Sequence, residues 1–509
     1  MSSRSILLKN GVALLRDGNG RIVPTRTSVL VENDRIAKIA KDIDVGQDAD
    51  IIDCTDKIIS PGFVDTHHHA WQTQLKGRHA NELLLQYMIS GNAQSFQYNE
   101  KDIFYGQLAG LLEALAAGTT TILDHAHLTY SPAHARNAIS ATVSSGMRLV
   151  YAYVPITRLK SFNPLTYVEN SLEAWVMDTF EQLASEGPWG NGRVTLGFGF
   201  DSWFLPREVI ADIFGKVKKA AVKTVTVHWA SSPQIGGGGP ESIVKILKKH
   251  DLLDERVVLS HANGCTKEDA DLIRGAGAYV SSTPSTELQM AMGRAVCFDG
   301  AFVDGGLVGD EVGLQDVASL GIDCHSNNAG SIISEARLGL QSSRNYFNDY
   351  YRRQGKTPHN LPENLSVEAA FNLATVEGAK ALHLEKEIGS IAEGYKADLV
   401  LFDAMSPSMV GAAQHDPVAA IILHSSPADI DTVIVDGIIR KRGGRLLDVA
   451  VDEFARGTVG QESLTWSEVA HEVVKSRARI QSEIEKIDFD EGLRSMKGVF
   501  YIDENVFVE

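Results

Sequence analysis

The chain has 509 residues, of which 44% are hydrophobic and 22% charged, and this ordinary globular composition provides for one large core and a second, smaller one. The net charge of −17 is spread without long runs of one sign, which argues against nucleic acid and anionic membrane surfaces as partners. No stretch approaches the roughly 20 apolar residues of a membrane helix, and nothing at the start resembles a signal peptide, so we expect a cytoplasmic protein.

The four cysteines agree with a reducing compartment. They are widely separated and form no CxxC pair: Cys54, Cys265, Cys297 and Cys324. Small secreted proteins that depend on disulfides have many cysteines in a short chain instead. We therefore expect no disulfide framework.

Short strand-like runs alternate with turns in the first 57 residues. The turns include Asp17-Gly18-Asn19-Gly20, and the runs lie at 5–9, 28–32, 35–39 and 50–53. This pattern predicts a small β unit.

From about residue 58 to 384, apolar strand-like runs alternate with helix-like segments. After the opening strand, the predicted strands lie at 119–124, 148–154, 193–200, 224–229, 257–261, 278–283 and 319–324. The best amphipathic helices lie at 101–118, 171–186, 207–221, 241–250 and 266–276. This alternation predicts an α/β fold, a (β/α)₈ TIM barrel, whose functional side chains belong at the carboxyl ends of the strands.

After about residue 385 the strand-like pattern returns, at 389–391, 397–402 and 430–440. Because the termini of compact domains often lie close together, the two β-rich flanks could form one discontinuous domain. We therefore predict a composite β domain from 1–58 and 385–448, a barrel at 59–384, and a helical tail at 449–509 whose best helix is 467–487. The tail could pack on the body of the protein or on a second subunit.

The opening strand of the predicted barrel, within 58–69, ends in three histidines. Since alternate side chains of a strand share a face, His67 and His69 point together and His68 points away. Two imidazoles on one face can converge on a metal ion if further ligands arrive from distant parts of the chain. The alternatives are a surface cluster or an expression tag, but this cluster lies well inside the chain and follows an apolar strand.

Further candidate ligands stand where other predicted strands end. His228 ends the fifth strand, His261 ends the sixth, and Asp323 ends the eighth. Each has an ordinary alternative, because such a histidine is often a hydrogen-bonded core residue and such an aspartate is often a helix cap. Four coincidences in one barrel favour a metal site with a position left open for water.

These residues resemble a known family. Pro61-Gly-Phe-Val-Asp-Thr-His-His-His69, His228, His261 and Gly321-Ile-Asp323, in this order and spacing, resemble the amidohydrolase superfamily. The likeness extends to about residue 448 and includes Gly394-Tyr-Lys-Ala-Asp-Leu-Val400. It is strongest to the mononuclear branch, which includes nucleobase deaminases and triazine hydrolases.

The resemblance implies a ligand set for one divalent metal ion, in the first place Zn²⁺ with Fe²⁺ as the alternative: His67, His69, His228 and Asp323. His261 would orient the attacking water or the leaving side of the substrate. The fourth strand ends without a lysine, at 196–200, so the resemblance does not extend to a carbamylated lysine or a second metal.

A bound divalent metal brings the pKa of a water molecule from 15.7 towards about 7, and Asp323 would take its proton. In the deaminases of this superfamily a glutamate three residues after the fifth-strand histidine then protonates the leaving group, but here that position is Ser231. This difference argues against ordinary nucleobase deamination. Glu287 or Asp323 itself could return the proton, although Glu287 could equally be an exposed loop carboxylate or a charge at a helix start.

Several other residues are candidates for the substrate pocket. His125 and His127 close the second strand and are candidates for substrate contacts or for support of the metal ligands, with ordinary structural roles as the alternative. Position alone suggests pocket-wall roles for Trp71, Gln72, Gln74 and Gln289.

The leading hypothesis is a metal-dependent hydrolase that acts on a C–N bond of a small cyclic or aromatic molecule, by amide hydrolysis or deamination. The absent glutamate motivates a second hypothesis, a metal-dependent decarboxylase or other lyase. A third is a non-catalytic binding protein on an enzyme scaffold, which the complete ligand set disfavours. We also expect a homo-oligomer, most simply a dimer.

Overall fold

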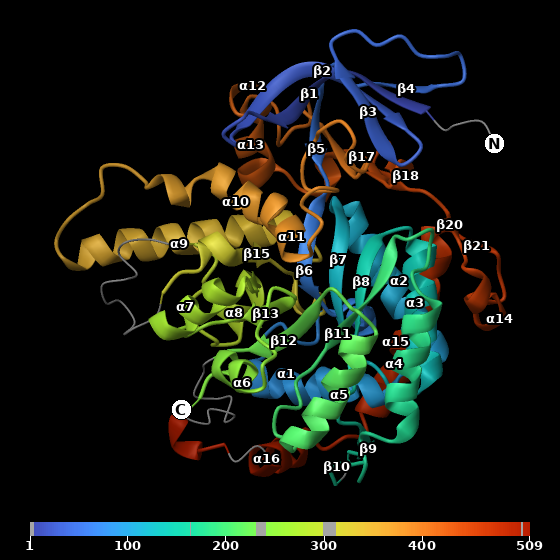
Figure 1. Ribbon diagram of the computed structural model, residues 1–509, viewed down its shortest axis with the longest axis vertical. Helices are drawn as coiled ribbons and strands as arrows, with labels where there is room; N and C mark the ends of the chain where they lie inside the picture. Colours follow the sequence, from blue (N-terminus) through green and yellow to red (C-terminus); the bar gives the residue numbers. More distant parts are fainter. Residues whose placement is uncertain (1–4, 163, 231–240, 299–311, 500–501, 509) are drawn as a thin grey trace.

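The computed structural model describes residues 5–162, 164–230, 241–298, 312–499 and 502–508. Figure 1 shows the strands that flank the barrel in the sequence at one pole, the barrel strands in the middle, and α1 (Leu84–Ser90) and α16 (Phe489–Val499) towards the opposite pole. The first barrel strand runs away from the terminal sheet, so the carboxyl ends of the parallel barrel strands face the pole of α1 and α16 (Figure 1).

Eight parallel strands form the barrel sheet, and they follow one another in chain order around it. They are β6 (Phe63–His68), β7 (Thr119–Ala126), β8 (Arg148–Tyr153), β11 (Val194–Gly199), β12 (Val225–Trp229), β13 (Val257–His261), β14 (Tyr279–Ser282) and β15 (Ala318–Leu320). This sheet confirms the predicted TIM barrel.

Contacts between the first and last strands bring the ends of the barrel together at the candidate site. Asp323 N donates to His67 O at 2.8 Å, and His69 N donates to Asp323 O at 3.0 Å. Gly321 allows this approach, because a Cβ atom there would lie 2.8 Å from both the Cβ and the carbonyl oxygen of His67. The backbone that completes the ring therefore carries three of the predicted ligands.

The run at 58–69, predicted as the opening strand of the barrel, forms two strands that belong to different sheets. β5 (Lys57–Pro61) belongs to the terminal sheet, whereas β6 belongs to the barrel. Gly62 separates them, and a Cβ atom at Gly62 would lie 2.1 Å from Thr120 Oγ1. Only glycine fits this close approach to β7.

The last predicted barrel strand is shorter than expected. The prediction was 319–324, but β15 ends at Leu320. Asp323 has a φ of +63°, which lies in the left-handed region and is incompatible with a strand. The regular strand therefore does not extend to Asp323.

Helices surround the barrel, with α3, α4 and α5 on one side and α7, α8 and α9 on the other (Figure 1). They are α1 (Leu84–Ser90), α2 (Glu100–Ala116), α3 (Pro132–Ser145), α4 (Ala174–Glu186), α5 (Arg207–Lys219), α6 (Ile243–Lys249), α7 (Lys267–Ala276), α8 (Pro284–Gln289), α9 (Ile332–Arg353), α10 (Val367–Leu373) and α11 (Val376–Ala381). A small hairpin, β9 (Leu159–Ser161) with β10 (Thr166–Tyr167), follows β8. Each of the five predicted helices is present.

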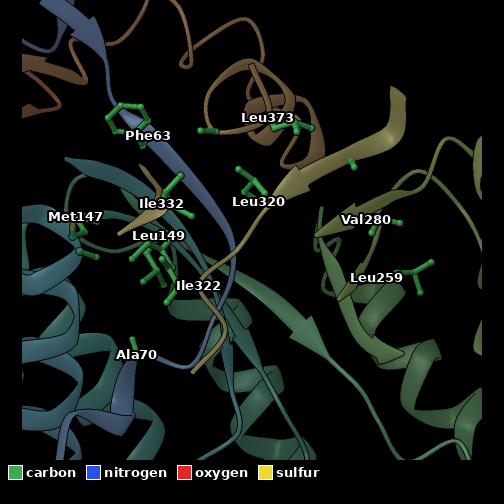
Figure 2. Close-up of a cluster of buried hydrophobic side chains, with 14 of the residues drawn as sticks. Phe63, Ala70, Met147, Leu149, Leu259, Val280, Leu320, Ile322, Ile332 and Leu373 are labelled. Carbon is green, nitrogen blue, oxygen red and sulfur yellow. The ribbon is translucent and has the colours of Figure 1, made fainter. Parts of the chain in front are cut away.

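The main core lies where the barrel strands meet these helices. Figure 2 shows its side chains coming from strands and helices alike, for example Phe63, Leu149, Leu259, Val280, Leu320, Ile332 and Leu373. The labelled residues are at most 3% exposed. Burial of this apolar surface is the dominant favourable contribution to the fold.

The terminal sheet combines strands from both flanks of the barrel. The N-terminal strands are β1 (Ser5–Arg16), β2 (Ile22–Glu32), β3 (Arg35–Ala40), β4 (Asp50–Asp53) and β5, and the C-terminal strands are β16 (Leu399–Asp403), β17 (Ile430–Val435), β18 (Ile438–Arg442) and β19 (Arg445–Leu446). β5 and β16 join the two groups as antiparallel neighbours. The segment 389–391, predicted to be strand-like, is not a strand. Three short helical pieces follow β16, namely α12 (Ala412–His415), α13 (Pro417–Ala419) and a π-helical turn at Ala420–His424.

The tail packs on the body of this chain, which answers a question that the sequence left open. It contains β20 (Val449–Ala450), β21 (Ser463–Leu464), α14 (Arg456–Val459), α15 (Trp466–Ile484) and α16 (Phe489–Val499). α15 contacts α2 and the short 3₁₀ helix η1 (Ala70–Leu75), and α16 contacts α1. In the part of the chain that the structure describes, none of the helices has the length and apolar character needed to cross a membrane.

Candidate active site

Four predicted metal ligands meet at the carboxyl ends of the strands. One potential metal-binding atom from each of His67, His69, His228 and Asp323 lies within 4.8 Å of the other three. The Nε2 atoms of His67 and His69 lie 3.2 and 3.0 Å from Asp323 Oδ1. The Nε2 atom of His228 lies 3.3 Å from Nε2 of His69.

The hydrogen bonds of two imidazoles fix which nitrogen faces the cluster. His69 Nδ1 donates to the carbonyl oxygen of His125 at 2.9 Å, and His228 Nδ1 donates to Asp201 Oδ2 at 2.9 Å. In a neutral imidazole the other nitrogen, Nε2, then carries a lone pair. The lone pair of His69 Nε2 therefore lies 3.0 Å from Asp323 Oδ1 and 3.3 Å from the lone pair of His228 Nε2.

Three acceptor atoms at such distances repel one another unless a cation lies among them. Imidazole nitrogens and a carboxylate oxygen are the donor types that zinc takes in proteins. His67 completes the set, because its Nδ1 is held by Ser260 Oγ at 2.7 Å and its Nε2 faces Asp323. The residues present thus fit a divalent metal ion.

Shifted pKa values and strained backbone angles occur within the same cluster of residues. Burial works against ionisation of Asp323, but its contacts with the rings of His67 and His69 hold the pKa of its carboxyl well below the usual range. Burial lowers the pKa of His67 well below that of a free imidazole. His261 and Asp323 have φ values of +78° and +63°, a strained region for residues other than glycine that is frequent at functional sites.

His261 lies beside the cluster. Its ring centroid is 5.5 Å from that of His67 and 5.8 Å from that of His228. Its Nδ1 is 2.9 Å from Thr283 Oγ1, so the ring is held by the residue that follows the neighbouring strand, β14.

Glu287 lies in α8 and is fully buried, so the exposed-loop alternative is wrong. Its carboxylate accepts hydrogen bonds from the backbone N of Thr283 at 2.7 Å and from Ser282 Oγ at 3.0 Å. His261 Nδ1 is 3.8 Å from Glu287 Oε1. The structure therefore places this carboxylate beside the Nδ1 edge of His261.

The two histidines at the end of β7 differ in their surroundings. Both ring nitrogens of His125 have partners, with Nε2 3.0 Å from Asp201 Oδ2 and Nδ1 3.4 Å from Thr226 Oγ1. The ring of His127 packs on that of His69 at 3.9 Å between centroids, and its Nδ1 accepts from Trp71 Nε1 at 3.2 Å. His127 and Trp71 thus lie against a metal-ligand candidate.

The three predicted pocket glutamines lie in separate networks. Gln72 donates to Tyr87 Oη at 2.8 Å and accepts from Ser326 Oγ at 2.8 Å. Gln289 donates to the carbonyl oxygen of His79, also at 2.8 Å. Gln74 binds the backbone of α2 and Ser476 of the tail, so it faces away from the metal ligands.

The sequence prediction missed Asp201. It follows β11, the fourth barrel strand, and contacts both His125 and His228. The signal was available, because a carboxylate directly after a barrel strand belongs at the same rim as the histidines.

His68 points away from the cluster, as its place in the strand predicts. Its Nδ1 is 2.7 Å from Asp65 Oδ2 and its Nε2 is 3.0 Å from His325 Nδ1. This buried chain lies directly behind the ligands of β6. Ser231, the residue at the position of the usual glutamate, lies outside the described residues.

The chain resembles two deaminases over most of its length. It is 26% identical over 471 residues to a 5'-deoxyadenosine deaminase of Methanobrevibacter smithii, covering 89% of this chain and 96% of the relative. It is 28% identical over 399 residues to a 5-methylthioadenosine/S-adenosylhomocysteine deaminase of Acetivibrio thermocellus, covering 76% of this chain and 82% of the relative.

Solved structures show the same fold. An adenosine deaminase of Xanthomonas campestris with bound zinc has a TM-score of 0.75 and 17% identity, covering 94% of this chain and 99% of that chain. A zinc complex of atrazine chlorohydrolase from Arthrobacter aurescens has a TM-score of 0.70 and 18% identity, covering 93% and 100%. The model of the amidohydrolase family matches residues 58–440, which is more than half of the chain. This protein therefore belongs to the amidohydrolase family and is a metal-dependent hydrolase of carbon–nitrogen bonds.

Proposed function

We propose that His67, His69, His228 and Asp323 hold one divalent metal ion, Zn²⁺ in the first place and Fe²⁺ as the alternative. The reaction is attack of water on a carbon–nitrogen bond of a small cyclic or aromatic compound. One observation carries the metal proposal: the acceptor atom His69 Nε2 lies 3.0 Å from Asp323 Oδ1 and 3.3 Å from His228 Nε2, which is also an acceptor. A divalent cation between these atoms would satisfy all of them.

When bound, the metal ion supplies a Lewis acid that makes water a nucleophile at neutral pH. Asp323 takes the proton of that water. Its Oδ1 contacts His67 and His69, while its Oδ2 contacts Cys324 Sγ at 3.5 Å. A carboxylate at this position can act as the general base.

His261 orients the water or the leaving side of the substrate. Thr283 holds its Nδ1 edge, which leaves Nε2 for that role. Glu287 acts on His261 from the same edge, since its carboxylate is fully buried and already accepts hydrogen bonds from Ser282 Oγ and Thr283 N. Of the two routes considered for the last proton, its return by Asp323 therefore has the better support.

The relatives direct the choice of substrates to test. Their names place their activity on 5'-deoxyadenosine, 5-methylthioadenosine and S-adenosylhomocysteine. We propose aminopurine nucleosides with altered 5' groups as the first class to test, followed by cyclic amides. Because Ser231 stands in place of the usual glutamate, the experiment also tests for the alternative reaction, that of a metal-dependent decarboxylase or other lyase.

The test combines metal removal with product analysis. Chelator-treated protein is expected to lose turnover and regain it with one equivalent of zinc, while a zinc-free buffer exchange serves as the control. In ¹⁸O-labelled water the product of a hydrolase carries one labelled oxygen, and a deaminase releases ammonia in equal amount. Full activity of the metal-free protein, or a product without label, would refute the proposal.

Two further expectations belong to the proposal. We expect a homodimer, which light scattering during size-exclusion chromatography measures directly. We expect the protein in the cytoplasm, which microscopy of a fluorescent fusion tests.

A further inference from the structure

One carboxylate contacts His228 on two sides. Asp201 Oδ1 accepts from the backbone N of His228 at 2.9 Å, and Asp201 Oδ2 accepts from its ring Nδ1 at 2.9 Å. The same Oδ2 accepts from His125 Nε2 at 3.0 Å. Main chain, ring and a second imidazole are thus tied to a single side chain.

His228 needs this support more than the other predicted histidine ligands do. The side chains of His67 and His69 are at most 3% exposed, whereas that of His228 is 29% exposed. The Nδ1 atoms of the first two are held by neutral groups, Ser260 Oγ and the carbonyl oxygen of His125. Among the described residues, Asp201 is the one charged group bound to a ligand's Nδ1 atom.

The contacts around Asp201 differ from those of the central cluster in one chemical respect. In the central cluster the atoms that face one another are acceptors, so they require a cation. Around Asp201 each contact pairs an N–H donor with a carboxylate oxygen, and nothing more is needed to satisfy it. Although His125, Asp201 and His228 have the residue types of a metal site, their contacts are those of a hydrogen-bonded support.

We propose that Asp201 is a positioning residue of the metal centre, with His125 holding Asp201 in turn. Asp201 keeps the proton of His228 on Nδ1, which presents Nε2 to the metal, and it fixes the rotation of the ring. A carboxylate at Nδ1 also makes the imidazole a stronger donor. This inference rests on the proposed function, and it assigns His125 a supporting role in place of contact with substrate.

The experiment measures zinc affinity by competition with a coloured chelator, and metal content by elemental analysis. Asp201→Asn keeps the size of the side chain but removes its charge, and we expect zinc affinity to fall about 10 to 100-fold. The d–d spectrum of the cobalt-substituted variant should also shift, because the angle of one ligand changes. Asp254→Asn is the matched control, since Asp254 is similarly exposed and pairs with Arg256. It should bind zinc like wild type.

His125→Phe tests the same support from its other end, and remains informative if Asp201→Asn does not fold. It should weaken zinc binding in the same direction and leave one equivalent of metal bound. If both variants had wild-type zinc affinity and an unchanged cobalt spectrum, this inference would be wrong and the proposed function would stand. Two equivalents of zinc in wild type and one in Asp201→Asn would also overturn the inference, since Asp201 would then be a ligand. A wild-type protein that binds no metal would instead overturn the proposed function.

Discussion

Replacing the buried Glu335 with glutamine should stabilise the protein above neutral pH. Glu335 lies in α9 with no exposed surface, and its carboxyl group contacts the backbone N and the hydroxyl of Ser285 in the first turn of α8. Burial, with a further contribution from Glu287, raises the pKa of Glu335 from 4.5 to about 8 against the opposing hydrogen bonds from Ser285. The folded protein therefore keeps this group protonated at neutral pH.

The sign and size of the effect follow from proton linkage. A raised pKa in the folded state gives stability that is complete below the unfolded pKa of 4.5 and is lost as the pH rises to about 8. One pKa unit corresponds to about 1.4 kcal/mol, so the whole interval corresponds to about 5 kcal/mol. Between pH 6 and pH 8 the loss is about 3 kcal/mol, as an upper value for a site that can relax.

Glutamine has the shape of the protonated side chain and can keep both contacts with Ser285, but it does not ionise. Urea unfolding of the two zinc-loaded proteins at pH 6 and pH 9, at equal zinc concentration, measures the effect. The variant's advantage in unfolding free energy should grow by about 3 kcal/mol between these pH values. Glu363→Gln, at a side chain that is 88% exposed, should show no such change. An equal advantage at both pH values would refute the reasoning.

Asp323→Ala should abolish measurable turnover and weaken zinc binding, because it removes a proposed ligand and the general base, a role worth about 10²- to 10⁴-fold in rate. Ser231→Ala, assayed for kcat and zinc content beside it, should stay close to wild type. A large loss of kcat in Ser231→Ala would mean that the proton route is misassigned. Glu287→Gln should lower kcat by about tenfold with little change in KM or zinc content, because it removes the charge beside His261 while its amide oxygen can still accept from Thr283 N. An unchanged kcat would mean that this carboxylate supports only the fold.

The barrel and the meeting of its ligands could be predicted from the sequence for a geometric reason. Parallel strands place their carboxyl ends at one rim, so any residue that follows an apolar run of the barrel must lie there. His67, His228 and Asp323 could thus be placed together without knowledge of a single contact. Their meeting depends on the topology of the strands.

Other features depend on contacts that topology does not determine. Glu287 lies at the expected rim, but whether its carboxylate faces a substrate or His261 depends on the start of α8 and on Thr283 N. β15 ends at Leu320, and Asp323, with its positive φ, is held by hydrogen bonds to the backbone of His67 and His69. Asp201 follows the fourth strand, where the prediction considered only a lysine. Its role depends on its contacts with His228.

The tail shows how a periodic pattern can predict an element without predicting its partner. The helix expected at 467–487 is present as α15, yet amphipathic spacing says only that one face is buried. In the structure Arg477 Nη1 donates to the carbonyl oxygens of Gln74 at 2.6 Å and Lys76 at 3.1 Å, at the end of η1. η1 directly follows His69, and Trp71 within it contacts His127. The tail therefore contacts the segment that follows the proposed ligands His67 and His69. We expect substitutions in α15 to affect the active site through η1.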